Sequence, residues 1–182
     1  MTRISRFLAD ESGTATIEFV FVIPIVMLIF MASVEASFFM ARHAMLERSV
    51  DIVVRGIRLG NYDSLTHTEL KTLICDDGML VQSSEDCIKF TKIWMQPINA
   101  ADFDWDVPPR FCIDKPEEIN PLNEPTGTEF AFGSDNEIML LRICLKQEPM
   151  FPTSVVGAGM IQGDPDGSYA LITTTVFVNE PG

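Results

Sequence analysis

The stretch GTATIEFVFVIPIVMLIFMASVEASFFM, from Gly13 to Met40, decides the fold of this chain of 182 residues. No charged residue occurs from Phe19 to Val34, and apolar side chains continue after Glu35, so the hydrophobic segment extends over residues 19–41. At 1.5 Å per helical residue, roughly 23 residues span ~34 Å, which is enough to cross a hydrocarbon core of about 30 Å. The sequence therefore predicts one transmembrane helix.

The helical pattern continues beyond this apolar segment. Apolar residues recur at spacings of three and four, and charged residues fall largely between them. Asp51 and Arg55 form a favourable i,i+4 pair. The Gly60-Asn61 pair is a helix stop signal, so we expect the helix to end at Arg58 or Leu59.

The charges divide the chain into a leader (1–13), a long helix (14–60) and a head (61–182). Residues 1–60 hold six basic and six acidic side chains, whereas residues 61–182 hold seven and twenty, so the head carries the whole formal charge of −13. An acidic head repels phosphate, which argues against nucleic-acid binding. The same charge argues against peripheral attachment to anionic lipid.

The head should begin with a short helix. Thr66 and Glu69 have the spacing of a capping box, and Asp77-Gly78 is a stop signal. Three apolar side chains of this helix are expected to face the core: Leu70, Leu73 and Ile74.

Three strands are expected after this helix. The first, Cys87–Gln96, stops at Pro97 and has an irregularity near Lys92, while prolines between positions 108 and 125 indicate a loop. The second, Glu137–Lys146, alternates apolar residues on one face, and the third, Tyr169–Val178, follows a turn at 164–167. The predicted fold class is α+β, with a long N-terminal helix, transmembrane and then amphipathic, before a small antiparallel-sheet head.

The residues around the start of the helix form a recognisable signal. Arg3 and Arg6 precede Gly13, and the acid Glu18 stands five residues after that glycine, followed by the aromatic Phe19 and the apolar run. This arrangement resembles the type III signal of type IV pilin-like proteins. Within that group the chain resembles the TadE-like minor pseudopilins of the tight adherence (Tad, or Flp) pilus system.

Two further features fit this resemblance. Pro24 lies within the apolar run, and Val176–Pro181 resembles the closing strand with Asn-Glu-Pro that such proteins carry. Two residues depart from it. Thr14 stands where classical type IV pilins have Phe, so N-terminal methylation is not carried over, and Phe19 stands where the Flp pattern more often has Tyr.

The resemblance implies roles for four of these residues. A prepilin peptidase would cut between Gly13 and Thr14. Glu18, with Phe19 beside it, would act in assembly by pairing with the new amino group of a neighbouring subunit. An unpaired carboxylate at the membrane edge is costly, which gives such a pairing a physical reason.

The resemblance also implies a location and partners. The protein would be a non-enzymatic structural component for pilus assembly and adhesion, without a cofactor. It would be a single-pass protein of the bacterial inner membrane with a periplasmic head, at the base or tip of the pilus. Its partners would be prepilin peptidase, other pseudopilins and pilins of the apparatus, and inner membrane lipid.

The four cysteines all follow the membrane segment: Cys75, Cys87, Cys112 and Cys144. No pair has C-x-x-C spacing, which argues against a zinc or thioredoxin-like site. In an oxidising compartment an even count indicates two disulfides. Of the three possible pairings we favour Cys75 with Cys87 and Cys112 with Cys144. The alternative, four free thiols in a cytosolic head, would require the reverse topology.

Catalytic and metal-binding patterns are weak. The only histidines are His43 and His67, which leave little material for a His-based triad. Asp102–Asp106 alternates acids as a calcium loop does, but Val107 replaces the required Gly and Ile113 stands at the twelfth position instead of Glu. The sequence therefore predicts neither an enzyme nor a metal site.

Two other interpretations of the N-terminus stay open. The apolar run could be the core of a conventional secretory signal cut after Ala36, which would release a soluble protein beginning at Ser37. Alternatively, an uncleaved single-pass membrane-anchored interaction protein would retain Met1. The N-terminal sequence of the mature protein separates these possibilities.

Overall fold

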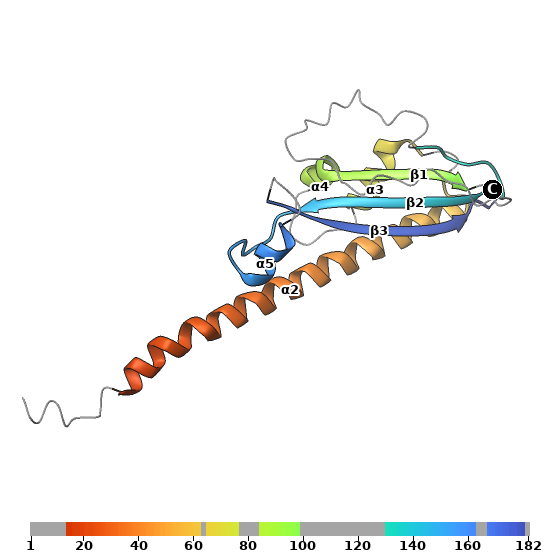
Figure 1. The fold of residues 1–182 in the computed structure, drawn as a ribbon. Coiled ribbons are helices and arrows are strands. Elements are labelled where there is room, and N and C mark those ends of the chain that lie inside the picture. The colour runs from red at the N-terminus through yellow and green to blue at the C-terminus, as the bar shows by residue number, and fades with distance from the viewer. Residues whose placement is uncertain (1–13, 63–64, 77–83, 99–129, 163–166, 181–182) are drawn as a thin grey trace, which may run out of the picture.

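In a computed structural model, a long helix carries a small head along its C-terminal half (Figure 1). The structure describes residues 14–62, 65–76, 84–98, 130–162 and 167–180. The elements are α2 (Thr14–Arg58), α3 (His67–Asp76), α4 (Ser84–Phe90), β1 (Thr91–Ile98), β2 (Ile138–Gln147), α5 (Val155–Met160) and β3 (Tyr169–Val178). The strands form one antiparallel sheet in the order β1-β2-β3. The predicted α+β fold class is confirmed.

Helix α2 is continuous over 45 residues and includes Pro24. It ends at Arg58, as the stop signal predicted. Gly60 has a positive φ of 66°, and the N–H of Asn61 donates to the carbonyl of Gly56 at 3.1 Å. This bond closes the last turn, because a glycine tolerates the left-handed conformation that a helix end often needs.

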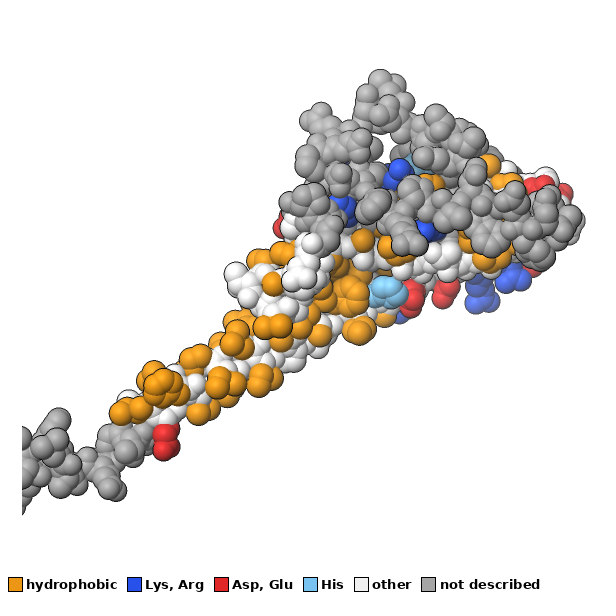
Figure 2. Space-filling model, in the orientation of Figure 1, with side chains coloured by type: hydrophobic (Ala, Val, Ile, Leu, Met, Phe, Trp, Pro, Cys, Tyr) orange, Lys and Arg blue, Asp and Glu red, His pale blue; other side chains and the backbone are white. Residues whose placement is uncertain are grey.

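The two halves of α2 lie in different surroundings. Large apolar side chains are exposed from Ile17 to Phe30 (Figure 2). In the second half, apolar side chains at helical spacing are buried against the head: Leu46, Val50, Val53, Val54 and Ile57. The helix therefore exposes apolar surface over its first half and forms part of the protein core over its second.

The core lies between α2, α3 and one face of the sheet. The alternating residues of β2 predicted to share a face are all buried, at 0 or 1 % exposure: Met139, Leu141, Ile143 and Leu145. Leu171 on β3 and Ile93 on β1 join the same cluster. Burying a side chain of this size contributes about 1.5 to 3 kcal/mol, so this face holds the sheet on the helix.

Helix α3 begins with the predicted capping box. The N–H of Thr66 donates to Oε2 of Glu69 at 2.9 Å, and the N–H of Glu69 donates to Oγ1 of Thr66 at 3.3 Å. The bond from the Thr66 backbone is the main cause that lowers the pKa of Glu69. Leu70 and Ile74 are fully buried and Leu73 packs against the core, as predicted.

The start predicted for the first strand is wrong. Cys87 to Phe90 belong to α4, and the strand begins at Thr91. Two acids, Glu85 and Asp86, stand in the first turn of α4, where they are favoured by the helix dipole. The disulfide of Cys87 further holds this turn against α3.

The end predicted for this strand is also wrong, because Pro97 lies inside β1 opposite Met139. Proline cannot donate a hydrogen bond, so it is normally confined to edge strands. Here β1 is an edge strand of the sheet. The carbonyl of Met95 accepts from the N–H of Ala131 on the outer side of β1, at 2.7 Å, and the backbone of Pro97, two residues on, faces that same side. The missing N–H therefore costs the sheet no bond to β2.

Helix α5 is a further short element, between β2 and β3. Oγ of Ser154 caps it by accepting from the N–H of Gly157 at 2.9 Å. A Cβ at Gly157 would clash with the carbonyl oxygen of Phe151, so glycine allows the chain to fold back closely here. The segment carries no charge and no clear periodicity, which explains why no helix was predicted for it.

Some of the predicted features lie outside the described residues. They are the leader (1–13), the Asp77-Gly78 stop signal, the loop of prolines from 108 to 125 and the acidic stretch Asp102–Asp106. The turn at 164–167 is described only at Gly167, which has a φ of 72°.

Candidate membrane-anchoring and assembly site

The predicted assembly residues lie at the exposed end of α2. Glu18 and Phe19 are both exposed, Phe19 at 63 %. Glu18 is the only charged residue of α2 before Glu35. Thr14 is the first helical residue, and Gly13 lies outside the described part, so the cleavage site stays a prediction.

Glu35 is fully buried where the head begins to cover the helix. Its Oε2 accepts a hydrogen bond from the N–H of Phe151 at 2.8 Å, and its Oε1 accepts one from the N–H of Met150 at 3.2 Å. A buried carboxylate is costly unless hydrogen bonds replace its water. In the sequence Glu35 is only an interruption of the apolar run, whereas in the structure it fastens the helix to the head.

Arg42, further along α2, also holds the head on the helix through hydrogen bonds. Its Nη1 donates to the hydroxyl of Tyr169 at 2.6 Å and to the carbonyl of Glu148 at 3.0 Å. Burial raises the pKa of Tyr169, although the hydrogen bond from Arg42 acts in the opposite direction. The ring of Phe39 packs on that of Tyr169, with 5.5 Å between centroids.

We call Glu35, Phe39, Arg42 and Tyr169 the junction cluster. Glu35 and Arg42 are seven positions apart, which places them on one face of a helix, and this spacing was the sequence signal that could have found the cluster. Glu35 and Arg42 on the helix bond the segment before α5 and Tyr169 on β3, which lie more than 100 positions later in the sequence.

The junction cluster bears on the membrane segment. One helix in the described part is long and apolar enough to cross a membrane. The predicted span of 19–41 includes positions 35–41, which lie alongside the head because Glu35 is buried and Phe39 packs on the core. The uncharged stretch before Glu35 runs from Phe19 to Val34, so its roughly 16 residues would measure ~24 Å.

The closing motif ties the far end of the head to the helix. The side-chain amide of Asn179 donates to the carbonyl of Gly133 at 2.9 Å. Glu180 pairs with Arg58 at the end of α2, with 3.0 Å between Oε1 and Nη2. Asn179 therefore joins two segments of the head, and Glu180 forms an exposed ion pair with the helix, while Pro181 lies outside the described residues.

The predicted disulfide between Cys75 and Cys87 is present and joins α3 to α4. The two positions are 12 residues apart. Cys144 is buried in β2, and Cys112 lies outside the described residues. The pairing of Cys112 with Cys144 stays a prediction.

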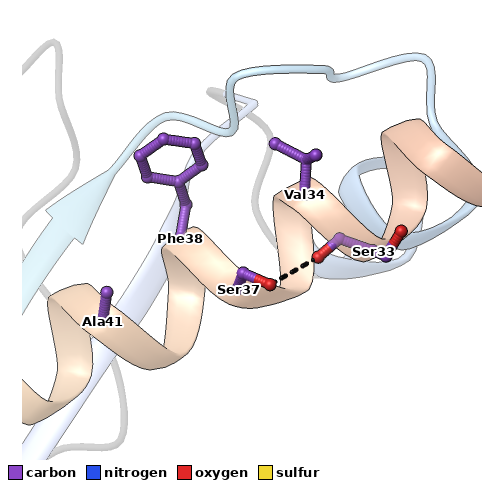
Figure 3. A pocket seen from close by; sticks show the side chains of 5 residues that line it. All are labelled: Ser33, Val34, Ser37, Phe38 and Ala41. Carbon is purple, nitrogen blue, oxygen red and sulfur yellow. Dashed lines mark hydrogen bonds between the residues drawn. The ribbon is translucent and has the colours of Figure 1, made fainter.

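A groove of about 440 Å³ lies on α2 beside the junction (Figure 3). It is lined by Ser33, Val34, Ser37, Phe38 and Ala41. The Ser37 hydroxyl donates to the carbonyl of Ser33 at 2.8 Å, and the Ser33 hydroxyl donates to that of Ile29 at 2.7 Å. Because both hydroxyls bond within the helix, the groove offers small apolar surface rather than reactive groups.

The rest of the described part offers few side chains suited to metal binding or catalysis. No group of three or more His, Cys, Asp or Glu side chains is placed to hold a metal ion within those residues. Burial, and then the nearby Lys71, lowers the pKa of His67 to about 4, so this imidazole is neutral at physiological pH. Its ring packs edge-on against Phe130, with 5.3 Å between centroids, which is a packing role.

Comparison with known proteins agrees with the N-terminal signal. Residues 13–55 match the model of the family described as TadE-like protein. No curated protein and no solved structure matches the chain. The matched residues include the signal, the exposed half of α2 and both Glu35 and Arg42. The resemblance to TadE-like proteins of the Tad pilus system is therefore confirmed over residues 13–55.

Proposed function

We propose that this protein is a minor pseudopilin, a processed and membrane-anchored structural component used to assemble the Tad pilus. The observation that carries the proposal is the family match of residues 13–55, which begins at the glycine of the signal. The architecture supports it, because α2 has an exposed apolar first half and carries the head on its second half. A family that builds pili also argues for a structural rather than a catalytic role.

The proposed location is the bacterial inner membrane, with a single span and the head in the periplasm. The exposed apolar surface from Ile17 to Phe30 supports the span, since lipid would cover it. The disulfide between Cys75 and Cys87 supports the side, because such bonds persist in oxidising compartments. In a cytosolic head these thiols would be kept reduced by the compartment.

Processing and assembly are proposed to involve opposite ends of one short segment. Prepilin peptidase would cut after Gly13, and the new amino group of Thr14 would meet Glu18 of a neighbouring pilin or pseudopilin. Glu18 is exposed and is flanked by apolar surface. In lipid this carboxylate would need a cationic partner, which the new N-terminus of another subunit can supply.

The negative charge of the head supports a minor rather than a major position in the pilus. The head carries a formal charge of −13, and many copies side by side would accumulate repulsion that is only partly screened over about 8 Å. A few copies at the base or tip, beside other subunits of the apparatus, would avoid this cost. There the head would contribute to assembly and so to adhesion.

The test is a count of subunits in purified pili. Quantitative mass spectrometry should find this chain in far smaller amounts than the main pilin, with a mature N-terminus at Thr14. Cells that lack the protein should form no pili. An amount equal to that of the main pilin would contradict the minor role. A mature chain beginning at Ser37 would instead support the conventional secretory interpretation.

A further inference from the structure

The segment around α5 lies at the base of the head, next to the place where the exposed half of α2 ends (Figure 1). We call residues 149–162 the α5 segment. Glu35 holds its start through the backbone N–H groups of Met150 and Phe151. Helix α5 itself packs against α2. The position of the α5 segment along the axis of α2 is therefore fixed.

The α5 segment is uncharged, although 21 % of the chain is charged and the head is strongly acidic. Its exposed side chains are uncharged and include two large apolar ones, Val155 at 73 % exposure and Met150 at 47 %, beside the polar Thr153 and Gln162. The buried hydroxyl of Ser154 is satisfied by the N–H of Gly157. An exposed apolar surface without charge, beside an apolar helix, indicates contact with lipid or protein rather than with water.

The depth of this segment follows from helix geometry. Glu18 and Glu35 are 17 positions apart, so they are separated by ~26 Å along the helix axis. The hydrocarbon core of a bilayer measures about 30 Å, and any helix tilt shortens the span further. If Glu18 lies at the cytoplasmic boundary of the hydrocarbon core, Glu35 does not reach the opposite boundary. The start of the α5 segment, which Glu35 binds, then lies within the bilayer as well.

We propose that the α5 segment is a second membrane contact, in which Val155 and Met150 enter the acyl–headgroup boundary of the leaflet on the head side. The proposal rests on the proposed anchoring of α2. The contact is apolar, since the acidic head gains nothing from anionic lipid. Surface segments of this kind insert about 5 to 10 Å, which matches the small size of α5. Two contacts, α2 and the α5 segment, fix how the head is rotated about the helix axis.

The test uses the full chain reconstituted in phosphatidylcholine vesicles, with or without bromine on the acyl chains. Bromine quenches tryptophan only on contact, and the native tryptophans provide a constant background. Three variants are compared with the unmodified chain: Val155→Trp in the α5 segment, Leu28→Trp on the exposed half of α2, and Val176→Trp near the far end of β3. Each of the three native side chains is more than half exposed, which makes the substitutions comparable.

Brominated lipid should quench the added fluorescence of Val155→Trp and Leu28→Trp, and should leave that of Val176→Trp unchanged. Quenching of Leu28→Trp without Val155→Trp would overturn the membrane contact while leaving the anchor intact. Blue-shifted but unquenched emission from Val155→Trp would place this side chain against protein, either in the head itself or in a second copy of the chain, and would likewise overturn the membrane contact. If neither is quenched, the anchor fails and the contact fails with it. Equal quenching of Val176→Trp would also overturn the proposal, because lipid would then reach the head without regard to the α5 segment.

Discussion

Oε2 of Glu35 lies 2.8 Å from the backbone nitrogen of Phe151, although 116 positions separate the two residues in the sequence. This hydrogen bond marks the level at which α2 changes from a helix with exposed apolar sides to one that is packed on a head. The head is thereby fastened at its base, and Arg42 adds a second bond to Tyr169 on the same side of the helix.

Replacing Glu35 should loosen this junction. Glu35→Ala leaves the N–H groups of Met150 and Phe151 without their acceptor, so we expect a loss of about 2 to 4 kcal/mol in the free energy of unfolding. The measurement is denaturant unfolding of the full chain in detergent micelles, followed by near-ultraviolet circular dichroism. The control is Glu47→Ala, an exposed acid on the same helix, which should change stability by less than about 0.5 kcal/mol. Equal effects of the two substitutions would contradict the role of Glu35.

Processing should depend on the size of residue 13. A peptidase at the cytoplasmic membrane face must approach the backbone between Gly13 and Thr14, and a branched side chain obstructs that approach. We expect Gly13→Val to leave a full-length precursor in the membrane fraction, detected by intact mass. Ser12→Ala, one residue earlier, serves as the control and should be processed normally. A mature mass unchanged by Gly13→Val would refute the cleavage site.

Glu18 should matter for assembly but not for cleavage. Glu18→Ala removes the carboxylate proposed to meet the new N-terminus of a neighbour, so the chain should be processed yet recovered poorly in purified pili. The measurement is the ratio of pilus-associated to membrane-bound chain. Glu47→Ala, which lies beyond the membrane segment, should keep the normal ratio. Normal incorporation of Glu18→Ala would end the pairing hypothesis.

The bond between Cys75 and Cys87 should stabilise the head. Closing a loop of this length contributes about 2 to 4 kcal/mol in the chain-entropy account, so the Cys75→Ala, Cys87→Ala double variant should unfold at lower denaturant concentration. Non-reducing peptide mapping should recover the linked pair, and should also test the predicted bond between Cys112 and Cys144. Four free thiols in protein isolated from cells would contradict both bonds and the export of the head.

Lys71 should give stability a dependence on pH in the alkaline range. Burial, and then the charge of Lys92, lowers its pKa from 10.5 to about 8. Between these two values the unfolded chain binds more protons than the folded one, so the free energy of unfolding rises with pH across this window. Below a pH of about 8 the full cost of the buried charge is present.

Lys71→Met should remove this cost and raise the free energy of unfolding at neutral pH by about 1 to 3 kcal/mol. The gain should shrink as the pH approaches the ordinary lysine pKa of 10.5, which denaturant titrations at several pH values would show. Lys89→Met on α4, where the side chain is exposed, is the matched control and should change little at any pH. A gain of equal size at neutral and alkaline pH would exclude buried charge as its cause.

Local signals predicted much of the fold. The stop signal at Gly60, the capping box of Thr66 and Glu69, and the alternation along β2 are all encoded within a few neighbouring residues, and each is present in the structure. The bounds predicted for β3, Tyr169–Val178, agree with the structure because its β-branched residues are contiguous.

The remaining features depend on contacts between distant segments. Cys87 lies in a helix held by a disulfide, and Pro97 is tolerated only because β1 is an edge strand, which local propensity does not reveal. The burial of Glu35 depends on Met150 and Phe151, more than 100 positions later. An acid within an apolar run indicates a missing partner, but the sequence alone does not say which segment supplies it.

The continuity of α2 has a mechanical consequence. Its 45 residues form one rod of ~68 Å, without a break between the part available to lipid and the part built into the head. The rod works as a lever, so a reorientation of about 10° within the bilayer would displace its far end by ~12 Å. If the first half of α2 is anchored as proposed, small movements of the anchor would displace the outer tip of the head, where Glu180 meets Arg58.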